Sequence, residues 1–257
     1  MPNFLRIVYS AVSVGVLFIA IIMLTGSSDF TKVVSTPTPP DSLEFNDFVE
    51  PTFPFIGTSI DGRKLGAGFP KDNQAARTLA IHLGDSAYVC FDTDLLRWSV
   101  AWTRKFMPMN LMHQVSYDDV FNKSNKLATI AGVPQIATGS YAGWISLKGD
   151  QNNFEIPASR PDWFPLPADE ARWNGVYTYG NKVVLNYTVG QTTIMELPGS
   201  VAFAGQTAFT RTFKLGSSPN ALGLILAEIT NGTRVQQNSR FAYIYEGANQ
   251  DTVTAIG

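Results

Sequence analysis

Apolar and polar residues alternate along several short segments of the chain, a pattern that is typical of β-strands. In the segment TLAIHLG, every second residue is a large aliphatic one: Leu79, Ile81 and Leu83. In LRWSVAWT, at residues 96–103, the alternation predicts one strand face that carries Leu96, Trp98, Val100 and Trp102. Both segments therefore predict strands with one face toward a hydrophobic core.

A longer β-rich region, residues 175–199, is divided into three runs by Gly180-Asn181 and Gly190-Gln191. Glycine at the first central position suits a type II′ hairpin turn, so we expect strands at 176–179, 182–189 and 192–197 in a meander. Residues 208–216, 222–232 and 240–247 supply three more short strand patterns. Because no helical crossovers separate these strands, the fold class predicted is an all-β antiparallel β-sandwich with large meander sheets.

The N-terminal segment differs from the rest, because residues 7–24 contain no charged residue. As a helix they would be roughly 27 Å long, close to the thickness of a bilayer's hydrocarbon core. With Arg6 before the run, the positive-inside rule places the remainder of the chain outside the cytoplasm, in the periplasm or at the cell surface. The alternative is a signal sequence that is cleaved to release a secreted protein.

Three parts of the chain follow from these patterns: a transmembrane anchor or signal sequence at 1–26, a Pro-rich linker at 27–54, and an extracytoplasmic β-sandwich domain at 55–257. The linker contains Pro37, Pro39 and Pro40 among Ser and Thr, a composition that favours extended chain. Within the domain, residues 104–172 lack a strong period. We expect long loops there, packed over the sheet by their aromatic and Met residues.

Composition narrows the classes of partner and cofactor. The 257 residues are 45% hydrophobic and 16% charged, with a formal net charge of -2 and no basic patch, so nucleic acid is not an expected partner. One cysteine permits neither an intrachain disulfide, nor a Cys-x-x-Cys-His haem site, nor a four-cysteine zinc site. No metal, haem or other cofactor is predicted for this chain.

Several segments in order, LAIHLGDSAYVCFDTDLLRWSVAWT, IAGVPQIATGSYAGW, RWNGVYTYGNKVVLNYTVGQTTIMELPG and AFTRTF, carry a resemblance. Together they resemble an uncharacterised extracytoplasmic domain near the N-terminus of large bacterial haem-binding proteins of the PVC type. In those proteins a propeller and a cytochrome c domain follow. The resemblance covers residues 55–245 and implies a β-rich module without an established activity. The redox function of the larger proteins is not implied, because the chain has no Cys-x-x-Cys-His.

The densest group of polar candidates lies in VCFDTDLLRWSVAWT, where Asp92 and Asp94 are one residue apart. One interpretation is a carboxylate pair that binds a ligand or shares acid–base work. The other is a turn between two strands, in which an Asp accepts a backbone N–H two residues on and has a lowered pKa. Asp94 is also expected to pair with Arg97.

The candidate ligand-binding residues are therefore Asp92, Asp94 and Arg97, together with three tryptophans near loop sequence that could stack on sugar rings, Trp144, Trp163 and Trp173. No complete catalytic constellation is recognisable. The function favoured is a membrane-anchored, non-catalytic module that binds carbohydrate or a partner protein. The alternatives are an enzyme that acts on polysaccharide or sugar through Asp92 and Asp94, and an accessory domain of a haem-containing dehydrogenase-like system.

Overall fold

The computed structural model describes residues 8–11, 53–84, 86–107, 127–147, 158, 165–203, 205–228, 232–237, 242–246 and 252–256. All regular structure in these residues is β-strand, and every strand pairing is antiparallel. The prediction of an all-β antiparallel fold is therefore confirmed for the described part of the chain.

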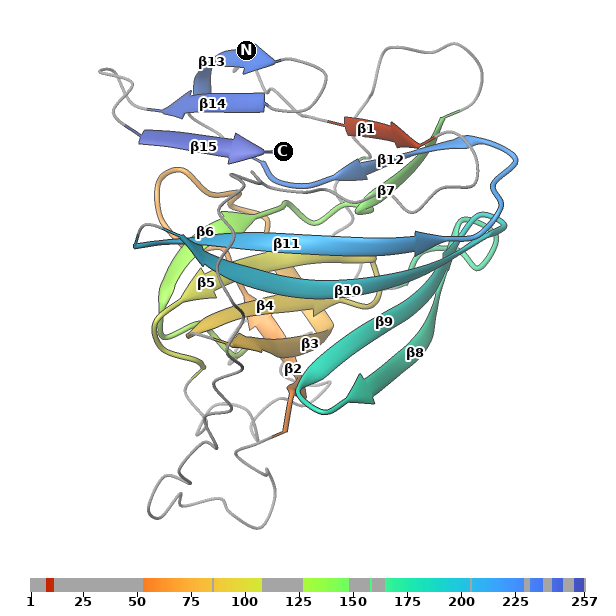
Figure 1. Ribbon diagram of the computed structural model, residues 1–257, viewed down its shortest axis with the longest axis horizontal. Helices are drawn as coiled ribbons and strands as arrows, with labels where there is room; N and C mark the ends of the chain where they lie inside the picture. The colour runs from red at the N-terminus through yellow and green to blue at the C-terminus, as the bar shows by residue number, and fades with distance from the viewer. Residues whose placement is uncertain are drawn as a thin grey trace, which may run out of the picture.

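The strands form four sheets (Figure 1). The largest has the order β2 (Phe55–Asp61), β3 (Gln74–Gly84), β4 (Ala87–Asp92), β5 (Arg97–Thr103), β6 (Val133–Ala137). The second has the order β11 (Gln206–Leu215), β10 (Thr192–Phe203), β9 (Lys182–Val189), β8 (Ala171–Tyr179). Two three-stranded sheets have the orders β1 (Val8–Ala11), β12 (Ala221–Ile225), β7 (Trp144–Leu147) and β13 (Gly232–Gln237), β14 (Ala242–Glu246), β15 (Thr252–Ile256).

Of the helix expected at residues 7–24, the structure describes only Val8–Ala11, which form the short strand β1 beside β12. The other residues of that segment, and nearly all of the predicted linker, lie outside the described residues. Among the residues that are described, no helix is long and apolar enough to cross a membrane. The anchor and the division into three parts stay predictions.

The meander prediction for residues 176–197 is confirmed. Strands β8, β9 and β10 are consecutive and antiparallel, and two-residue turns connect Tyr179 to Lys182 and Val189 to Thr192. Gly180 and Gly190 have φ values of 57° and 56°. A positive φ at the first central residue is what a type II′ turn requires, and only glycine adopts it without steric cost.

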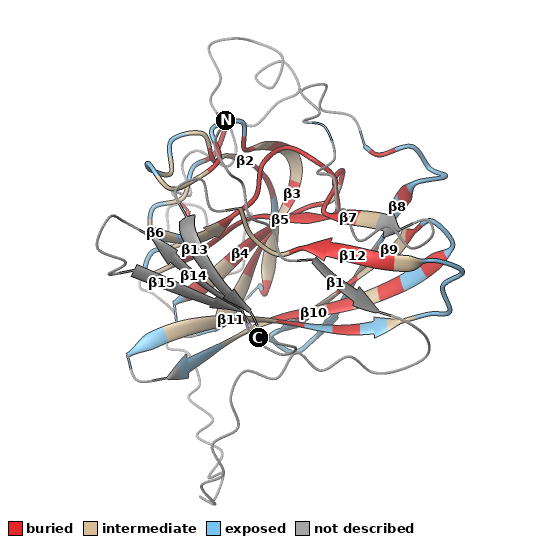
Figure 2. Ribbon diagram, turned by 90° about the horizontal axis from the view of Figure 1, so that it is seen from above, coloured by how far each residue is buried: buried red, intermediate tan, exposed pale blue. Residues whose placement is uncertain are grey.

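The main hydrophobic core lies between the five-stranded and the four-stranded sheet. It contains buried side chains from both, among them Ile81, Val89 and Phe91 on one side and Leu185 and Ile194 on the other. In Figure 2 the red, buried stretches of these strands face one another across the molecule. Leu79, Ile81 and Leu83 all contribute to this core, as their alternation predicts.

The opposite face of the five-stranded sheet is covered as well. A second cluster joins Cys90, Val100 and Trp102 of the sheet to Met107 and Ala128 of the flanking segments. Phe106 packs against it, with its ring centroid 6.0 Å from that of Trp102. In the described part of residues 104–172, apolar and Met side chains thus cover the sheet as expected.

One prediction about β5 is wrong: Trp98 and Trp102 do not share a face. Trp98 belongs to the core between the two sheets, whereas Trp102 belongs to the second cluster. The reason is a bulge, because Cys90 pairs with Val100 whereas the next residue, Phe91, pairs with Trp98. One extra residue in β5 reverses the side-chain alternation beyond it.

A buried ion pair stands in the core between the sheets. Glu196 of β10 accepts hydrogen bonds from Nε of Arg211 at 2.7 Å and from its Nη2 at 2.9 Å, and both side chains are nearly inaccessible. Indole Nε1 of Trp98 donates to the same carboxylate at 2.7 Å, and the Tyr187 hydroxyl donates at 2.6 Å. Trp98 lies on β5, so this network ties the two sheets together with directional bonds.

Candidate binding pocket at the turn after β4

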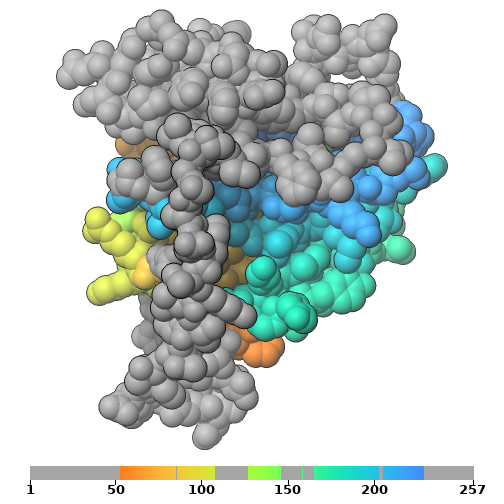
Figure 3. All heavy atoms as spheres, in the orientation of Figure 1, coloured from red at the N-terminus to blue at the C-terminus, as the bar shows by residue number. Residues whose placement is uncertain are grey.

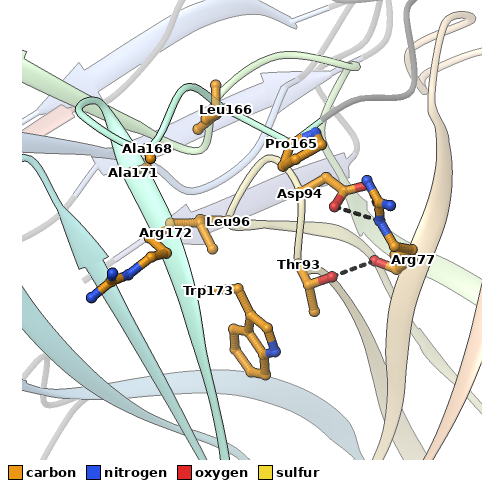
Figure 4. Close-up of a pocket in the computed structure, with 10 residues that line it drawn as sticks. All are labelled: Arg77, Thr93, Asp94, Leu96, Pro165, Leu166, Ala168, Ala171, Arg172 and Trp173. Atoms are coloured by element: carbon orange, nitrogen blue, oxygen red, sulfur yellow. Dashed lines mark hydrogen bonds and ion pairs between the residues drawn. The ribbon is translucent and has the colours of Figure 1, made fainter.

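A pocket of about 290 Å³ opens beside the turn that connects β4 to β5 (Figure 4). It is formed by three segments: β3, the turn itself, and the start of β8 with the residues that lead into it. Its lining residues are Arg77, Thr93, Asp94, Leu96, Pro165, Leu166, Ala168, Ala171, Arg172 and Trp173. Two of the candidates from the sequence, Asp94 and Trp173, therefore meet in one pocket.

The side chain of Asp92 caps the turn. Asp92 is the last residue of β4 and is 1% exposed. Its Oδ1 accepts backbone N–H groups from Asp94 at 3.0 Å and from Leu95 at 3.3 Å. The prediction that Asp92-Thr93-Asp94 lies at a turn between antiparallel strands, with an Asp accepting a backbone N–H, is confirmed.

Arg97 is fully buried and holds several segments of the chain together. Its Nε donates to Oδ2 of Asp92 at 3.0 Å. Its Nη1 and Nη2 donate to acceptors at the start of β3 and just after β6. These acceptors are Asn73 Oδ1 at 2.9 Å, Thr138 O at 2.8 Å, Thr138 Oγ1 at 3.2 Å and Gln74 O at 2.8 Å. With its guanidinium enclosed in this way, Arg97 orders the scaffold beneath the turn and does not line the pocket.

The expected pairing of Asp94 with Arg97 is wrong. Asp92 takes Arg97, and Asp94 pairs with Arg77 of β3, whose Nε donates to Oδ1 at 2.8 Å and Oδ2 at 2.9 Å. The side chain of Arg77 is 41% exposed and that of Asp94 10% exposed. The residue spacing alone could not separate these alternatives, because side chains on opposite sides of a turn reach different strands.

Burial raises the pKa of both aspartates, which corrects the expectation of a lowered value. For Asp92 desolvation is the largest influence, and the opposing effects of Arg97 and the two backbone N–H groups are smaller. For Asp94 desolvation is again the largest, the Arg77 hydrogen bond opposes it, and the charge of Asp92 adds to it. A solvent-exposed Asp that accepts the same backbone N–H groups would have a lowered pKa, whereas Asp92 accepts them from a buried position.

The backbone of the turn is strained and its polar groups anchor the surrounding loops. Leu96 has a φ of 51°, in the left-handed region that a branched side chain rarely adopts. The carbonyl of Asp94 accepts from the N–H of Leu166 at 3.0 Å, and that of Leu95 accepts from Gly143 at 2.8 Å. A Cβ at residue 143 would lie 2.4 Å from the carbonyl oxygen of Leu96, so only glycine permits this approach.

Trp173 forms an aromatic wall of the pocket. It is half-buried on β8, and its ring centroid lies 5.6 Å from that of Phe91 in the core, which fixes the indole from behind. Arg172 precedes it on the same strand, is exposed, and donates from Nε to Asn174 at 3.2 Å. In Figure 4 the guanidinium of Arg172 points away from Thr93 and Trp173, at the rim.

The other two tryptophans do not join Trp173. Trp144 is 8% exposed on β7, and its Nε1 donates to the Tyr187 hydroxyl at 3.2 Å in the core between the sheets. It cannot stack on a ligand in this structure, and the expectation that it could is corrected: the strand places its indole inward. Trp163 lies outside the described residues.

Sequence reasoning missed Arg77 and Thr93. The hydroxyl of Thr93 donates to the carbonyl of Arg77 at 3.0 Å, and the backbone N–H of Thr93 donates to the same oxygen at 3.0 Å. The signal was present in the predicted strand at 78–84, since a hairpin that pairs Thr78 with Asp92 places Arg77 beside the turn. No group of three or more His, Cys, Asp or Glu residues that could hold a metal occurs in the described part of the chain.

In its described residues the chain is an all-β antiparallel module with an aromatic pocket beside a strained turn. Residues 89–196 match the model of a family described as a domain of unknown function, DUF6797. The match runs from Val89 to Glu196 and so includes the turn and every pocket residue except Arg77. No curated protein and no solved structure matches the chain.

Proposed function

We propose that the chain is a non-catalytic binding module whose pocket beside Trp173 takes a sugar ring. The observation that carries the proposal is that the half-buried indole of Trp173 and the Arg77–Asp94 ion pair line the same pocket of about 290 Å³. That volume is at the lower end of small-molecule pockets and fits one ring better than an extended ligand.

The pocket offers complementary groups to a sugar. An indole face presents a rigid apolar surface to the C–H bonds of a pyranose ring. The carboxylate of Asp94 has lone pairs beyond those that accept from Arg77 Nε, so it can accept hydrogen bonds from sugar hydroxyl groups. The partly exposed side chain of Arg77 holds this carboxylate in place. Because these side chains are already held in place, little conformational entropy is lost when a ligand binds.

An enzyme that uses Asp92 and Asp94 as a carboxylate pair has less support. Acid–base work requires both carboxylates to reach the substrate. Asp92 is enclosed beneath the turn, where its two oxygens are engaged by Asp94 N–H, Leu95 N–H and Arg97. An accessory role in a haem-containing system rests on the sequence resemblance alone and adds nothing to this proposal.

The location proposed for the module is outside the cytoplasm, anchored by the apolar segment at residues 7–24 or secreted after its removal. Its support is the uncharged run in the sequence and the Pro-rich segment that follows. A carbohydrate ligand at a cell surface is consistent with this location.

The proposal is tested with a glycan array probed by the purified full-length chain and by its Trp173→Ala variant. Binding to a restricted set of saccharides that disappears in Trp173→Ala supports the proposal. Binding that is unchanged in the variant, or no binding to any saccharide, contradicts it.

A further inference from the structure

The outer face of the four-stranded sheet carries two exposed aromatic rings. Tyr177 is 55% exposed and Tyr179 is 84% exposed. They are two residues apart on β8 and pair with Val184 and Lys182 of β9, whose neighbours Val183 and Leu185 are buried in the core. Alternation along a strand therefore places both rings on the solvent side, about 7 Å apart along the strand.

Polar side chains on the same face are joined by hydrogen bonds. Asn186 donates to the Tyr177 hydroxyl at 3.3 Å, and Asn174 donates to Thr188 Oγ1 at 2.8 Å. Asn174 in turn accepts from Nε of Arg172, which lines the pocket. Asn174 also donates to Asn186 Oδ1 at 3.5 Å, which links the two groups. We call these residues, together with Tyr179, the tyrosine strip: Arg172, Asn174, Tyr177, Tyr179, Asn186 and Thr188. The teal atoms of this part of the chain lie at the molecular surface in Figure 3.

The chemistry of the tyrosine strip indicates its occupant. Its interior is uncharged, with one cation, Arg172, at the pocket end and another, Lys182, opposite Tyr179 at the far end. A nucleic acid requires several cations along its path, and between Arg172 and Lys182 the described residues of the strip carry none. A peptide that added a strand to the edge of β8 would meet the bulge between Trp173 and Gly175, where the hydrogen-bonding register shifts.

We propose that the tyrosine strip binds an uncharged polysaccharide with a flat, ribbon-like chain, such as a β-1,4-linked glucan. Sugar rings stack on Tyr177 and Tyr179, and the amides of Asn174 and Asn186 hydrogen-bond to hydroxyl groups. Trp173 packs toward the core whereas the rings of the strip face solvent, so the strip and the pocket lie on opposite faces of β8. The strip is a second site, and stacking on it does not rest on the proposed function of the pocket.

The test measures affinity against chain length, by titrating the full-length protein with glucose and with cello-oligosaccharides of two to six units. We expect affinity to rise with length in the wild type. In Tyr177→Ala and Tyr179→Ala the rise is lost, with about a tenfold weaker affinity for cellohexaose. Tyr177→Phe keeps the stacking ring and should retain most of the gain. Val201→Ala is the matched control, because Val201 is also exposed, on β10.

A second measurement, retention on insoluble cellulose, separates the two proposals. If Trp173→Ala loses binding to short saccharides but is still retained on cellulose through the tyrosines, the strip is supported and the pocket is tested independently. Affinity that is independent of length, together with retention that is equal in Tyr177→Ala, Tyr179→Ala and the wild type, overturns the strip proposal whatever the pocket does. Thermal melts of each variant show whether it is folded.

Discussion

Replacing Asp92 by alanine should destabilise the fold far more than replacing Asp94 by alanine. Asp92→Ala removes the counter-charge of Arg97, which has no exposed surface, and the cap of the turn. Breaking a buried ion pair by removing one partner costs about 3–5 kcal/mol, because the other charge stays buried. Asp94 pairs with an arginine that is 41% exposed, and such pairs contribute roughly 0–1 kcal/mol.

The difference is measurable by thermal melts. For a domain of this size 1 kcal/mol shifts Tm by roughly 2–4 °C, so Asp92→Ala should lower Tm by roughly 6–20 °C and Asp94→Ala by less than about 4 °C. The double variant Asp92→Ala/Arg97→Met should recover part of the loss, because no charge is then left buried. Equal melting temperatures for Asp92→Ala and the wild type would refute this reasoning. A double variant that loses more stability than the two single variants lose together would refute it as well.

Three further predictions concern buried groups in and around the core. Burial raises the pKa of the Cys90 thiol to about 12, so a thiol reagent at pH 8 should label the protein only after denaturant is added; labelling of the native protein would contradict this. Burial lowers the pKa of His82 in the folded protein. As the pH falls through about 6.5, the unfolded chain therefore binds a proton at this residue before the folded protein does, and the free energy of unfolding decreases toward acid pH. The urea midpoints at pH 7.5 and pH 5.5 should differ less in His82→Phe than in the wild type. Glu196→Ala should lower the free energy of unfolding, measured in urea, by about 3–5 kcal/mol, because it leaves the charge of Arg211 buried without a partner. The double variant Glu196→Leu/Arg211→Met should lower it much less. The opposite order would show that the directional bonds of the pair outweigh the cost of burying its charges.

Local patterns in the sequence predicted the elements well where one physical rule decides the outcome. The alternation of Leu79, Ile81 and Leu83 identifies the core face of β3, because side chains on a strand alternate with period two. Gly180 and Gly190 identify the hairpin turns, because only glycine adopts the required φ without strain. Asp92 identifies the turn after β4, because its side chain reaches backbone N–H groups two and three residues on.

The features that the sequence could not predict depend on tertiary contacts. The bulge in β5 sends Trp102 to the opposite face from Trp98, and nothing in the alternation of LRWSVAWT marks the extra residue. Asp92 pairs with Arg97 and Asp94 pairs with Arg77, and these pairings depend on which strand lies beside the turn. Desolvation by burial determines the direction of the pKa shift of Asp92, and the spacing of residues in the sequence does not report burial.

The central claim is that the pocket beside Trp173 binds a sugar ring, and calorimetric titration tests it most directly. The strongest saccharide from the glycan array would be titrated into the full-length wild type, Trp173→Ala and Trp102→Phe, the last being a change in the second core cluster, away from the pocket. We expect that Trp173→Ala lowers the melting temperature but leaves the protein folded, and weakens binding by at least about tenfold, whereas Trp102→Phe leaves the affinity unchanged. Equal affinity in the wild type and in a folded Trp173→Ala would contradict it.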